Sequence, residues 1–419
     1  SLQEIFGWTK SDLGIFETML PLVYGLSVVF NAPLADKIGG RKAFLIGAVG
    51  VVIFNIAFGA FYMVVIEPAQ WLTKGDTQEM VQAAQLSGGL GARSMAWIMA
   101  TIWALNGYFQ SFGALSIVKI NAQWFHLRER GTFGAIFGVL IRFGLILSFS
   151  GAPLIVAYLP WQWAFWIPAG FVALLFFLNL VFVVDTPEEA GFSEKDTGDA
   201  TLGEKGQTIT TRMILAKILT SRTMWMIGVA SMMIGMVRRS VVDAWFPVYF
   251  NEVHHVARTD WMYQLVAWGI ALLGIAGGFA FGIMSDRVYK GRRAPAVVFG
   301  FTGMAVMLVL FYFSDTLELG AWGALTCIVL LSFFVNGAHG MVGGAASMDF
   351  GGRKAAATAA GLIDGMQYLA AAVTGVVVGE ITTTYGWQAW KLWPIPFAVI
   401  GALVMLKLWN VVPKGRGGH

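Results

Sequence analysis

The chain has 419 residues, of which 57% are hydrophobic and only 12% are charged. This charged fraction is about half of that in an average soluble domain, and the mean hydropathy is +0.68. The composition excludes an ordinary cytosolic protein, a disordered chain and a nucleic-acid-binding protein. It favours a protein that crosses a lipid bilayer many times. The single cysteine, Cys327, excludes a disulfide framework and a cysteine metal site.

Eleven segments are apolar enough, over about 20 residues each, to cross a bilayer as helices. In chain order they are Asp12–Leu34, Lys42–Ile66, Met95–Asn121, Gly131–Ala157, Trp163–Val184, Thr223–Phe250, Trp261–Ser285, Ala294–Phe313, Ala321–Ser347, Ala356–Thr382 and Trp390–Val411. A membrane barrel would instead need alternating strands of about ten residues. The predicted fold class is therefore an all-α polytopic membrane protein.

Basic residues are concentrated in every second loop, which predicts the orientation because cytoplasmic loops are rich in Lys and Arg. The basic set comprises Lys37, Arg41 and Lys42; Arg128 and Arg130; Arg212, Lys217 and Arg222; Arg287, Lys290, Arg292 and Arg293; Arg353 and Lys354; and Lys414 and Arg416. This predicts that the C-terminus and the long polar linker are cytoplasmic and that the first residues are outside. The linker, 185–222, divides the chain into an N-terminal bundle, 1–184, and a C-terminal bundle, 223–419.

Two of the predicted inner loops resemble each other. One follows the first span and contains Asp36 and Arg41, and the other follows the seventh span and contains Asp286, Arg287 and Arg292. Each places an aspartate at the inner end of a helix and basic side chains just after it, where they complement the carbonyl end of that helix. We interpret the loops as equivalent points in two halves, and we expect them to stabilise the state that is closed toward the cytoplasm.

The spacing of these loops predicts a further helix. Two spans of the second half precede Asp286, but only one span precedes Asp36. We therefore expect that one N-terminal helix is absent from this sequence and that the parent chain has twelve spans in two sets of six. The alternative is a true eleven-span protein whose N-terminus lies outside.

Several motifs along the chain occur in a familiar order. They are Tyr24-Gly25-Leu26-Ser27; Gly107-Tyr108-Phe109-Gln110; Trp124-Phe125-His126-Leu127-Arg128-Glu129-Arg130-Gly131; Asp185-Thr186-Pro187-Glu188 with Gly191; Arg239 with Trp245-Phe246-Pro247-Val248-Tyr249; and Arg353-Lys354-Ala355-Ala356 with Thr358-Ala359-Ala360-Gly361 and Tyr368. Together with the paired loops, they make the chain resemble the major facilitator superfamily, and within it the organophosphate:phosphate antiporters. Two departures from the antiporter pattern are Ile141-Arg142, which replaces a His-Asn pair, and Ala114-Leu115-Ser116, which replaces Trp-Pro-Pro.

The resemblance implies two helical bundles that expose a central site alternately to each side of a bacterial inner membrane. It implies transport of an organophosphate or a related organic anion in exchange for inorganic phosphate by a monomer without a cofactor or a metal. Two alternatives remain open at this point. One is a proton-coupled symporter of a carboxylate or sugar acid, and the other is a transporter-like organophosphate sensor. The sequence has no nucleotide-binding loop, zinc-protease motif or nucleophile elbow, so we do not expect an enzyme.

Charged residues inside the predicted spans are the candidate functional residues. A charge at the bilayer centre costs about 2.5–3.5 kcal/mol on insertion scales, so it is retained where it faces a cavity or a partner. The candidates are Glu17, Lys119, Arg142, Arg238, Arg239, Asp243, Asp364, Glu380 and Lys407. For Lys119 we expect snorkelling toward the cytoplasm first and substrate guidance second, and Lys407 is expected to snorkel.

Arg239 is the first candidate for phosphate binding, because it lies mid-span and matches the substrate-binding arginine of the antiporters. A guanidinium group can hold two phosphate oxygens at once. The alternative is an ion pair with Asp243, which lies four residues on. Arg238 points about 100° away around an α-helix, and we expect it to form a structural ion pair.

Arg142 is the second candidate phosphate ligand, and the alternative for it is a buried pair with Glu17 or Asp364. Tyr24 and Tyr368 match family tyrosines near the site and could donate to phosphate. The carboxylates Glu17, Asp243 and Asp364 are candidates for ion pairs with the arginines or for proton relays.

Overall fold

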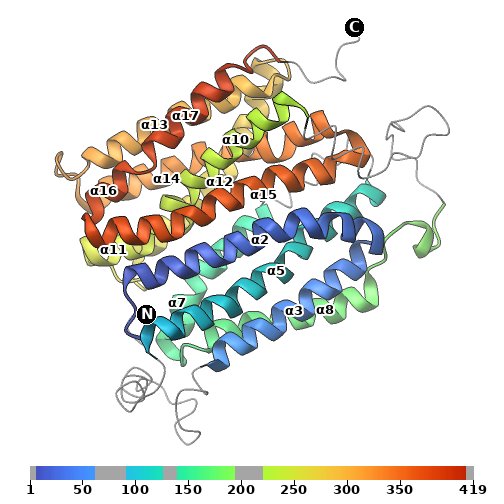
Figure 1. Ribbon diagram of the computed structural model, residues 1–419, viewed down its shortest axis with the longest axis horizontal. Helices are drawn as coiled ribbons and strands as arrows, with labels where there is room; N and C mark the ends of the chain where they lie inside the picture. The colour runs from blue at the N-terminus through green and yellow to red at the C-terminus, as the bar shows by residue number, and fades with distance from the viewer. Residues whose placement is uncertain (1–5, 62–90, 126–138, 194–219, 412–419) are drawn as a thin grey trace, which may run out of the picture.

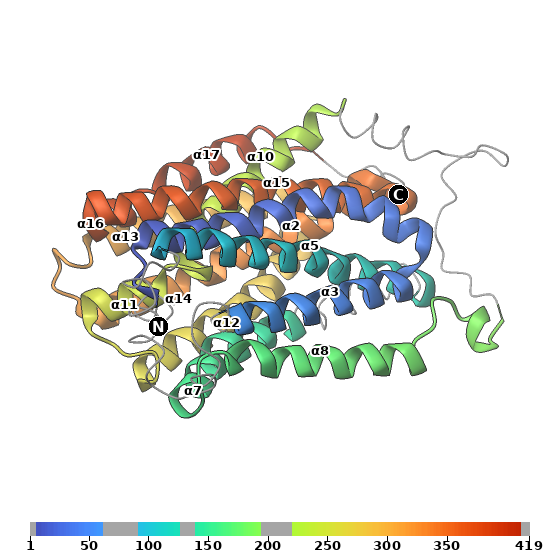
Figure 2. The ribbon, with the colours of Figure 1, turned by 60° about the horizontal axis from the view of Figure 1, so that its bottom comes forward.

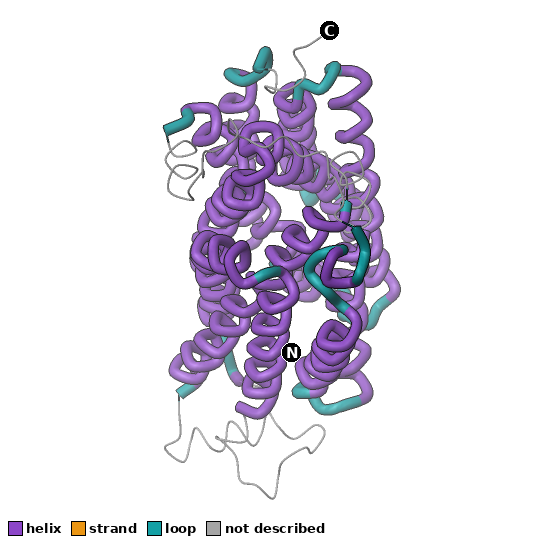
Figure 3. The backbone as a smooth tube through the Cα atoms, turned by 90° about the vertical axis from the view of Figure 1, so that its right-hand side faces the viewer, coloured by secondary structure: helices purple, strands orange, loops and turns teal. Residues whose placement is uncertain are grey.

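The computed structural model describes residues 6–61, 91–125, 139–193 and 220–411, without the side chains of residues 33, 36, 118, 122 and 344–360. All regular secondary structure in these residues is helical (Figure 3). The side chains of Asp36, Arg353 and Lys354, and the segment with Arg128 and Arg130, lie outside the described residues.

The first group of helices is built from the N-terminal part of the chain. It comprises α2 (Lys10–Ile38), α3 (Gly40–Ala60), α5 (Ala92–Trp124), a helix described from Val139 that continues through the π-helical turn η3 (Leu147–Gly151) into α7 (Ala152–Tyr158), and α8 (Trp163–Phe182). Within this group α5 packs between α2 and α3, and α3 also contacts α8 (Figure 1).

The second group follows the linker, in which the short 3₁₀-helix η4 (Glu188–Ala190) is described. It comprises α10 (Arg222–Val237), η5 (Arg238–Asp243), α11 (Phe246–His254), α12 (Trp261–Ile283), η6 (Met284–Val288), α13 (Arg293–Phe313), α14 (Gly320–His339), η7 (Gly340–Ala346), α15 (Ser347–Thr384), α16 (Gly386–Leu392) and α17 (Ile395–Leu406). Most of the buried apolar side chains of the described residues form one core in this group.

Ten described helical segments are long and apolar enough to cross a membrane. They correspond to ten of the eleven predicted spans. The remaining prediction, Met95–Asn121, lies on α5, which is 33 residues long but is not among the ten. The chain is therefore a multi-pass helical membrane protein, and the predicted total of eleven visible spans out of twelve stays a prediction.

The two groups meet along α2 and α15, which lie side by side (Figures 1 and 2). Glycines allow this close approach, because a Cβ atom on Gly375 would lie 2.5 Å from the backbone nitrogen of Thr18. The Thr18 hydroxyl donates to the carbonyl of Ala372 at 2.8 Å and accepts from the amide of Val376 at 2.9 Å. A second contact joins the groups where η3 meets α12.

Replacing Gly375 with Val is expected to lower the thermal stability of the purified protein. The new side chain would overlap the backbone of α2, and overpacking of this kind typically destabilises by about 1–3 kcal/mol. The measurement is the melting temperature in detergent. Gly170→Val on α8 is the matched control, because no described atom lies within 4 Å of a Cβ atom at that position. Equal melting temperatures for the two variants would contradict the close packing of α2 on α15.

Candidate functional site: a polar cluster between the two helix groups

Charged and polar side chains from both groups meet between them, in helices that are otherwise apolar. We call this set the central polar cluster. Its members are Glu17 on α2, Arg142 on the helix described from Val139, Arg238, Arg239 and Asp243 on η5, and Asn336 on α14.

The π-helical turn η5 positions three of these side chains. Pro247 lacks an N–H group, and its ring opposes the carbonyl of the residue four positions earlier, Asp243, so an α-helix cannot continue through this point. The chain responds with the wider turn η5 and a break at Ala244 before α11 begins. Trp390 donates its indole N–H to the carbonyl of Ser240 at 2.8 Å, which compensates for the altered backbone pairing.

This wider turn changes the predicted pairing of the two arginines. Arg238 donates from Nε to Asp243 Oδ2 at 2.6 Å, which confirms that it forms an ion pair. Arg239 pairs instead with Glu17 of α2, across the boundary between the two groups. The alternative pair of Arg239 with Asp243 assumed an α-helix, whereas a π-helical turn places residues five apart on one side.

Arg142 is buried and has a neutral partner. Its side chain is 8% exposed, and one terminal nitrogen, Nη2, donates to the amide oxygen of Asn336 in the other group. The alternative of a buried ion pair with Glu17 or Asp364 is therefore wrong among the described residues. The other terminal nitrogen, Nη1, is buried and has no hydrogen-bond partner there. A buried guanidinium N–H without an acceptor is costly, so this nitrogen is available to a ligand.

Tyr368 and the third carboxylate, Asp364, lie on α15, and Tyr24 lies on the neighbouring helix α2. The rings of Tyr24 and Tyr368 are in contact, with centroids 4.4 Å apart. Asp364 and His339 both lie near Gly343, where a Cβ atom would lie 3.7 Å from the first and 3.5 Å from the second. Asp364 forms no ion pair with another described residue.

Lys119 lies near the end of α5, which stops at Trp124, in agreement with its predicted place near the inner end of a span. The hydrogen bond and ion pairs described above for the central polar cluster do not involve Lys119.

Asn336 is the member that the sequence interpretation missed. The predicted site residues inside the spans are charged residues and two tyrosines, and Asn336 is neither. A usable signal was present, because an amide in the apolar segment Ala321–Ser347 must find a partner in lipid, as a charge must.

The first of the paired loops contacts the start of the linker, and the second makes a contact within its own group. The backbone N–H of Arg41 donates to Asp185 Oδ1 at 2.7 Å, and Gly39 precedes it with φ of 91°, a conformation that favours glycine. Asp286 Oδ1 accepts from Arg293 at 2.8 Å. The role of the loops in closing the inner side stays a prediction.

Two other predicted loop residues, Arg287 and Arg292, take different positions. Arg287 is exposed, and Arg292 donates from Nε to the carbonyl of Tyr289 at 3.3 Å.

Further contacts join the groups near the N-terminal end of α2, the predicted outer end. Lys10 forms an ion pair of 2.6 Å with Glu252, and its ammonium group lies 5.0 Å from the ring centroid of Trp387. Ser11 donates to Glu380 at 3.1 Å. The structure therefore has its predicted outer side joined by polar contacts, and the pair between Arg239 and Glu17 is part of the same boundary.

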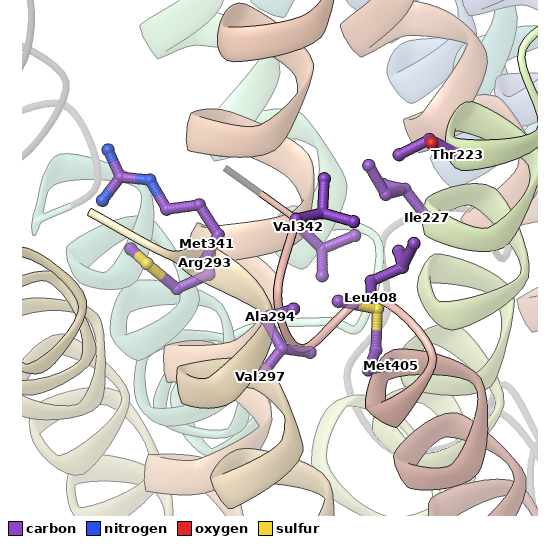
Figure 4. A pocket seen from close by; sticks show the side chains of 10 residues that line it. Thr223, Ile227, Arg293, Ala294, Val297, Met341, Val342, Met405 and Leu408 are labelled. Atoms are coloured by element: carbon purple, nitrogen blue, oxygen red, sulfur yellow. The ribbon is translucent and has the colours of Figure 1, made fainter. Parts of the chain in front are cut away.

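A small pocket lies elsewhere, inside the second group (Figure 4). Its lining is mainly apolar, from residues such as Ile227, Val297, Val342 and Met405, and Arg293 points its guanidinium group away from them. None of the members of the central polar cluster lines it. An apolar pocket does not suit a small anion, so it is not the candidate site. Within the described residues, no three His, Cys, Asp or Glu side chains are grouped to hold a metal ion.

Comparisons with known proteins agree with this architecture. The family model of the Major Facilitator Superfamily matches residues 1–375. The chain is 25% identical to a probable hexose phosphate transport protein of Chlamydia pneumoniae, over 97% of this chain and 85% of that protein. It is 26% identical to the glycerol-3-phosphate transporter of Bacillus subtilis, over 96% of this chain and 85% of that protein.

Two further similarities bear on function and fold. The membrane sensor protein UhpC of Salmonella typhimurium is 24% identical, over 96% of this chain and 84% of that protein. The crystal structure of a D-xylose-proton symporter has a TM-score of 0.67 at 16% identity and covers 98% of this chain and 89% of its own. The last similarity supports the fold alone.

Proposed function

The chain belongs to the major facilitator superfamily, and from this premise we propose that it is a secondary active transporter of an organophosphate or a related organic anion. It exchanges this anion for inorganic phosphate by alternating access. The similarity to hexose phosphate and glycerol-3-phosphate transporters supports the substrate class.

The observation that carries this proposal is Arg142, a buried guanidinium group whose partner is a neutral amide. A charge inside the membrane is energetically costly, so a charged residue there indicates a functional site. Here the nitrogen Nη1 has no acceptor among the described residues. A phosphoryl oxygen is an acceptor that a guanidinium group binds strongly, often through two parallel hydrogen bonds.

Arg239 supplies the second phosphate ligand in this mechanism. In the structure its charge is paired with Glu17, so an incoming dianion competes with that carboxylate for the guanidinium group. Since Arg142 and Arg239 come from different groups, an anion bound to both draws the two groups together. Tyr24 and Tyr368 lie at the same boundary and contact the organic part or donate to phosphate.

Exchange follows from the electrostatics of this site. Without a ligand, at least one guanidinium charge stays uncompensated in a region of low dielectric constant, and enclosing it fully is unfavourable. A bound phosphate or organophosphate neutralises it. The loaded protein therefore changes conformation readily, whereas the empty protein does not.

The test is counterflow in proteoliposomes. We expect uptake of labelled glycerol-3-phosphate or glucose-6-phosphate into vesicles loaded with inorganic phosphate, and little uptake into vesicles without it. Uptake that ignores internal phosphate and follows an imposed pH gradient would support proton-coupled symport of a carboxylate or sugar acid instead.

A second candidate function is organophosphate sensing, which the similarity to UhpC favours. A sensor would bind the organophosphate without transporting it and would pass the signal to a partner protein. Binding of glycerol-3-phosphate or glucose-6-phosphate by the purified protein, without counterflow, would support this function.

The proposed location is the bacterial inner membrane, with the C-terminus and the central linker in the cytoplasm. The basic loops support this orientation. The functional unit is proposed to be a monomer, because each chain contains both helix groups and the boundary between them.

A further inference from the structure

Asn336 is held in a fixed orientation by a chain of hydrogen bonds. Its amide nitrogen donates to the carbonyl of Ser332 at 2.8 Å and to the hydroxyl of Ser332 at 2.9 Å. That hydroxyl donates to the carbonyl of Ile270 on α12 at 2.7 Å. With both amide protons used in this way, the amide oxygen is directed to Arg142.

The three arginines of the central polar cluster have unequal partners. Arg238 and Arg239 each pair with a carboxylate, Asp243 and Glu17. Arg142 is bonded to an amide oxygen, which orients the guanidinium group but carries no net charge. Asp364, the remaining carboxylate near these helices, forms no ion pair with a described residue. Arg142 is therefore the one arginine of the central polar cluster whose charge has no carboxylate partner among the described residues.

We propose that Asn336 is a positioning residue that orients Arg142 for the anion while leaving its charge uncompensated. This inference rests on the proposed exchange function and deepens it. The neutral amide keeps the empty site positively charged, so that the two groups enclose the site only when an anion is bound. A carboxylate at this position would neutralise Arg142 in place of the anion. The two groups could then enclose the empty site.

The test is the substitution Asn336→Asp, which keeps the shape of the side chain and adds a negative charge. Phosphate–phosphate exchange and net phosphate efflux into phosphate-free medium are measured on the same proteoliposomes. We expect the ratio of net efflux to exchange to rise about tenfold and KM for phosphate to rise by a similar factor, as an ion pair competes with the ligand. An unchanged ratio in the folded variant would overturn the proposal.

Two further variants separate orientation from charge. Asn336→Leu and Ser332→Ala remove the acceptor or its support without adding charge. For both variants we expect KM for phosphate to rise several-fold, which corresponds to the free energy of one lost hydrogen bond. The ratio of net efflux to exchange should not change. An unaltered KM in Ser332→Ala and Asn336→Leu would overturn the positioning role, even if Asn336→Asp did not fold.

Asn31→Asp is the matched control. Asn31 is a buried amide on α2 that donates to Ser111 at 2.8 Å instead of bonding an arginine. The substitution Asn31→Asp adds a buried carboxylate away from the arginines. We therefore expect the ratio of net efflux to exchange to stay at the wild-type value. Wild-type exchange in the same preparation tests the proposed function separately. Its absence would reject exchange, whereas normal wild-type exchange with an unchanged Asn336→Asp ratio would reject only the role of Asn336.

Discussion

Replacing Arg239 with Lys is expected to reduce phosphate exchange at least about tenfold while the protein stays folded. Lysine keeps the positive charge and can still pair with Glu17, so the contact between α2 and η5 is retained. It loses the planar fork that holds two phosphate oxygens, and each charged hydrogen bond is worth about 1.5–3 kcal/mol. The measurement is counterflow of labelled phosphate in proteoliposomes, normalised to the amount of inserted protein.

Arg238→Lys is the matched control for this prediction. The two arginines are neighbours on η5, but Arg238 pairs with Asp243 of the same turn and has a structural role in our account. We expect it to keep most of the exchange activity. Near-normal exchange by Arg239→Lys would mean that Arg239 only pairs with Glu17 and that its guanidinium group is not a phosphate ligand.

Replacing Arg142 with Gln is expected to have the larger effect. The substitution removes the one guanidinium group of the central polar cluster that has no carboxylate partner among the described residues, and glutamine cannot attract a dianion. Loss of two charged hydrogen bonds corresponds to a decrease in phosphate affinity of about 100-fold or more. Exchange should fall to the background of protein-free vesicles at micromolar substrate.

Lys407→Gln serves as the control for loss of a membrane-associated charge. Lys407 is exposed and directly follows α17, away from the central polar cluster. Its substitution is expected to leave exchange near the wild-type rate. If Arg142→Gln and Lys407→Gln behaved alike, the assignment of Arg142 to the anion site would be wrong.

The positions of the helices could be predicted because lipid imposes a simple requirement on the sequence. Long apolar runs must form helices, and the predicted spans agree with ten described ones. Charges inside those runs identified Arg142 and Arg239 as residues that need a partner or a function. The packing of α2 on α15 was beyond prediction, because it depends on small residues such as Gly25 and Gly375, whose distant partners the sequence does not specify.

The pairing of the charges required the structure for a local reason. An α-helix through residue 247 would have placed Arg239 beside Asp243, but Pro247 forces the wider turn and pairs Arg238 with Asp243 instead. Arg239 is thereby free to reach Glu17 of the other group. Asn336 was not predicted because an uncharged amide gives a weaker signal in an apolar segment than a charge does. The same lack of charge leaves the charge of Arg142 uncompensated.

The most direct test of the central claim is whether the purified protein binds inorganic phosphate. Binding is measured as a change in the melting temperature of the protein in detergent. If the arginines between the two groups hold the anion, phosphate raises the melting temperature of the wild type in a concentration-dependent way. The same phosphate concentrations should leave the melting temperatures of the Arg142→Gln and Arg239→Gln variants unchanged. Sodium chloride at equal ionic strength is the control. Equal stabilisation of the wild type and both variants by phosphate would contradict the account.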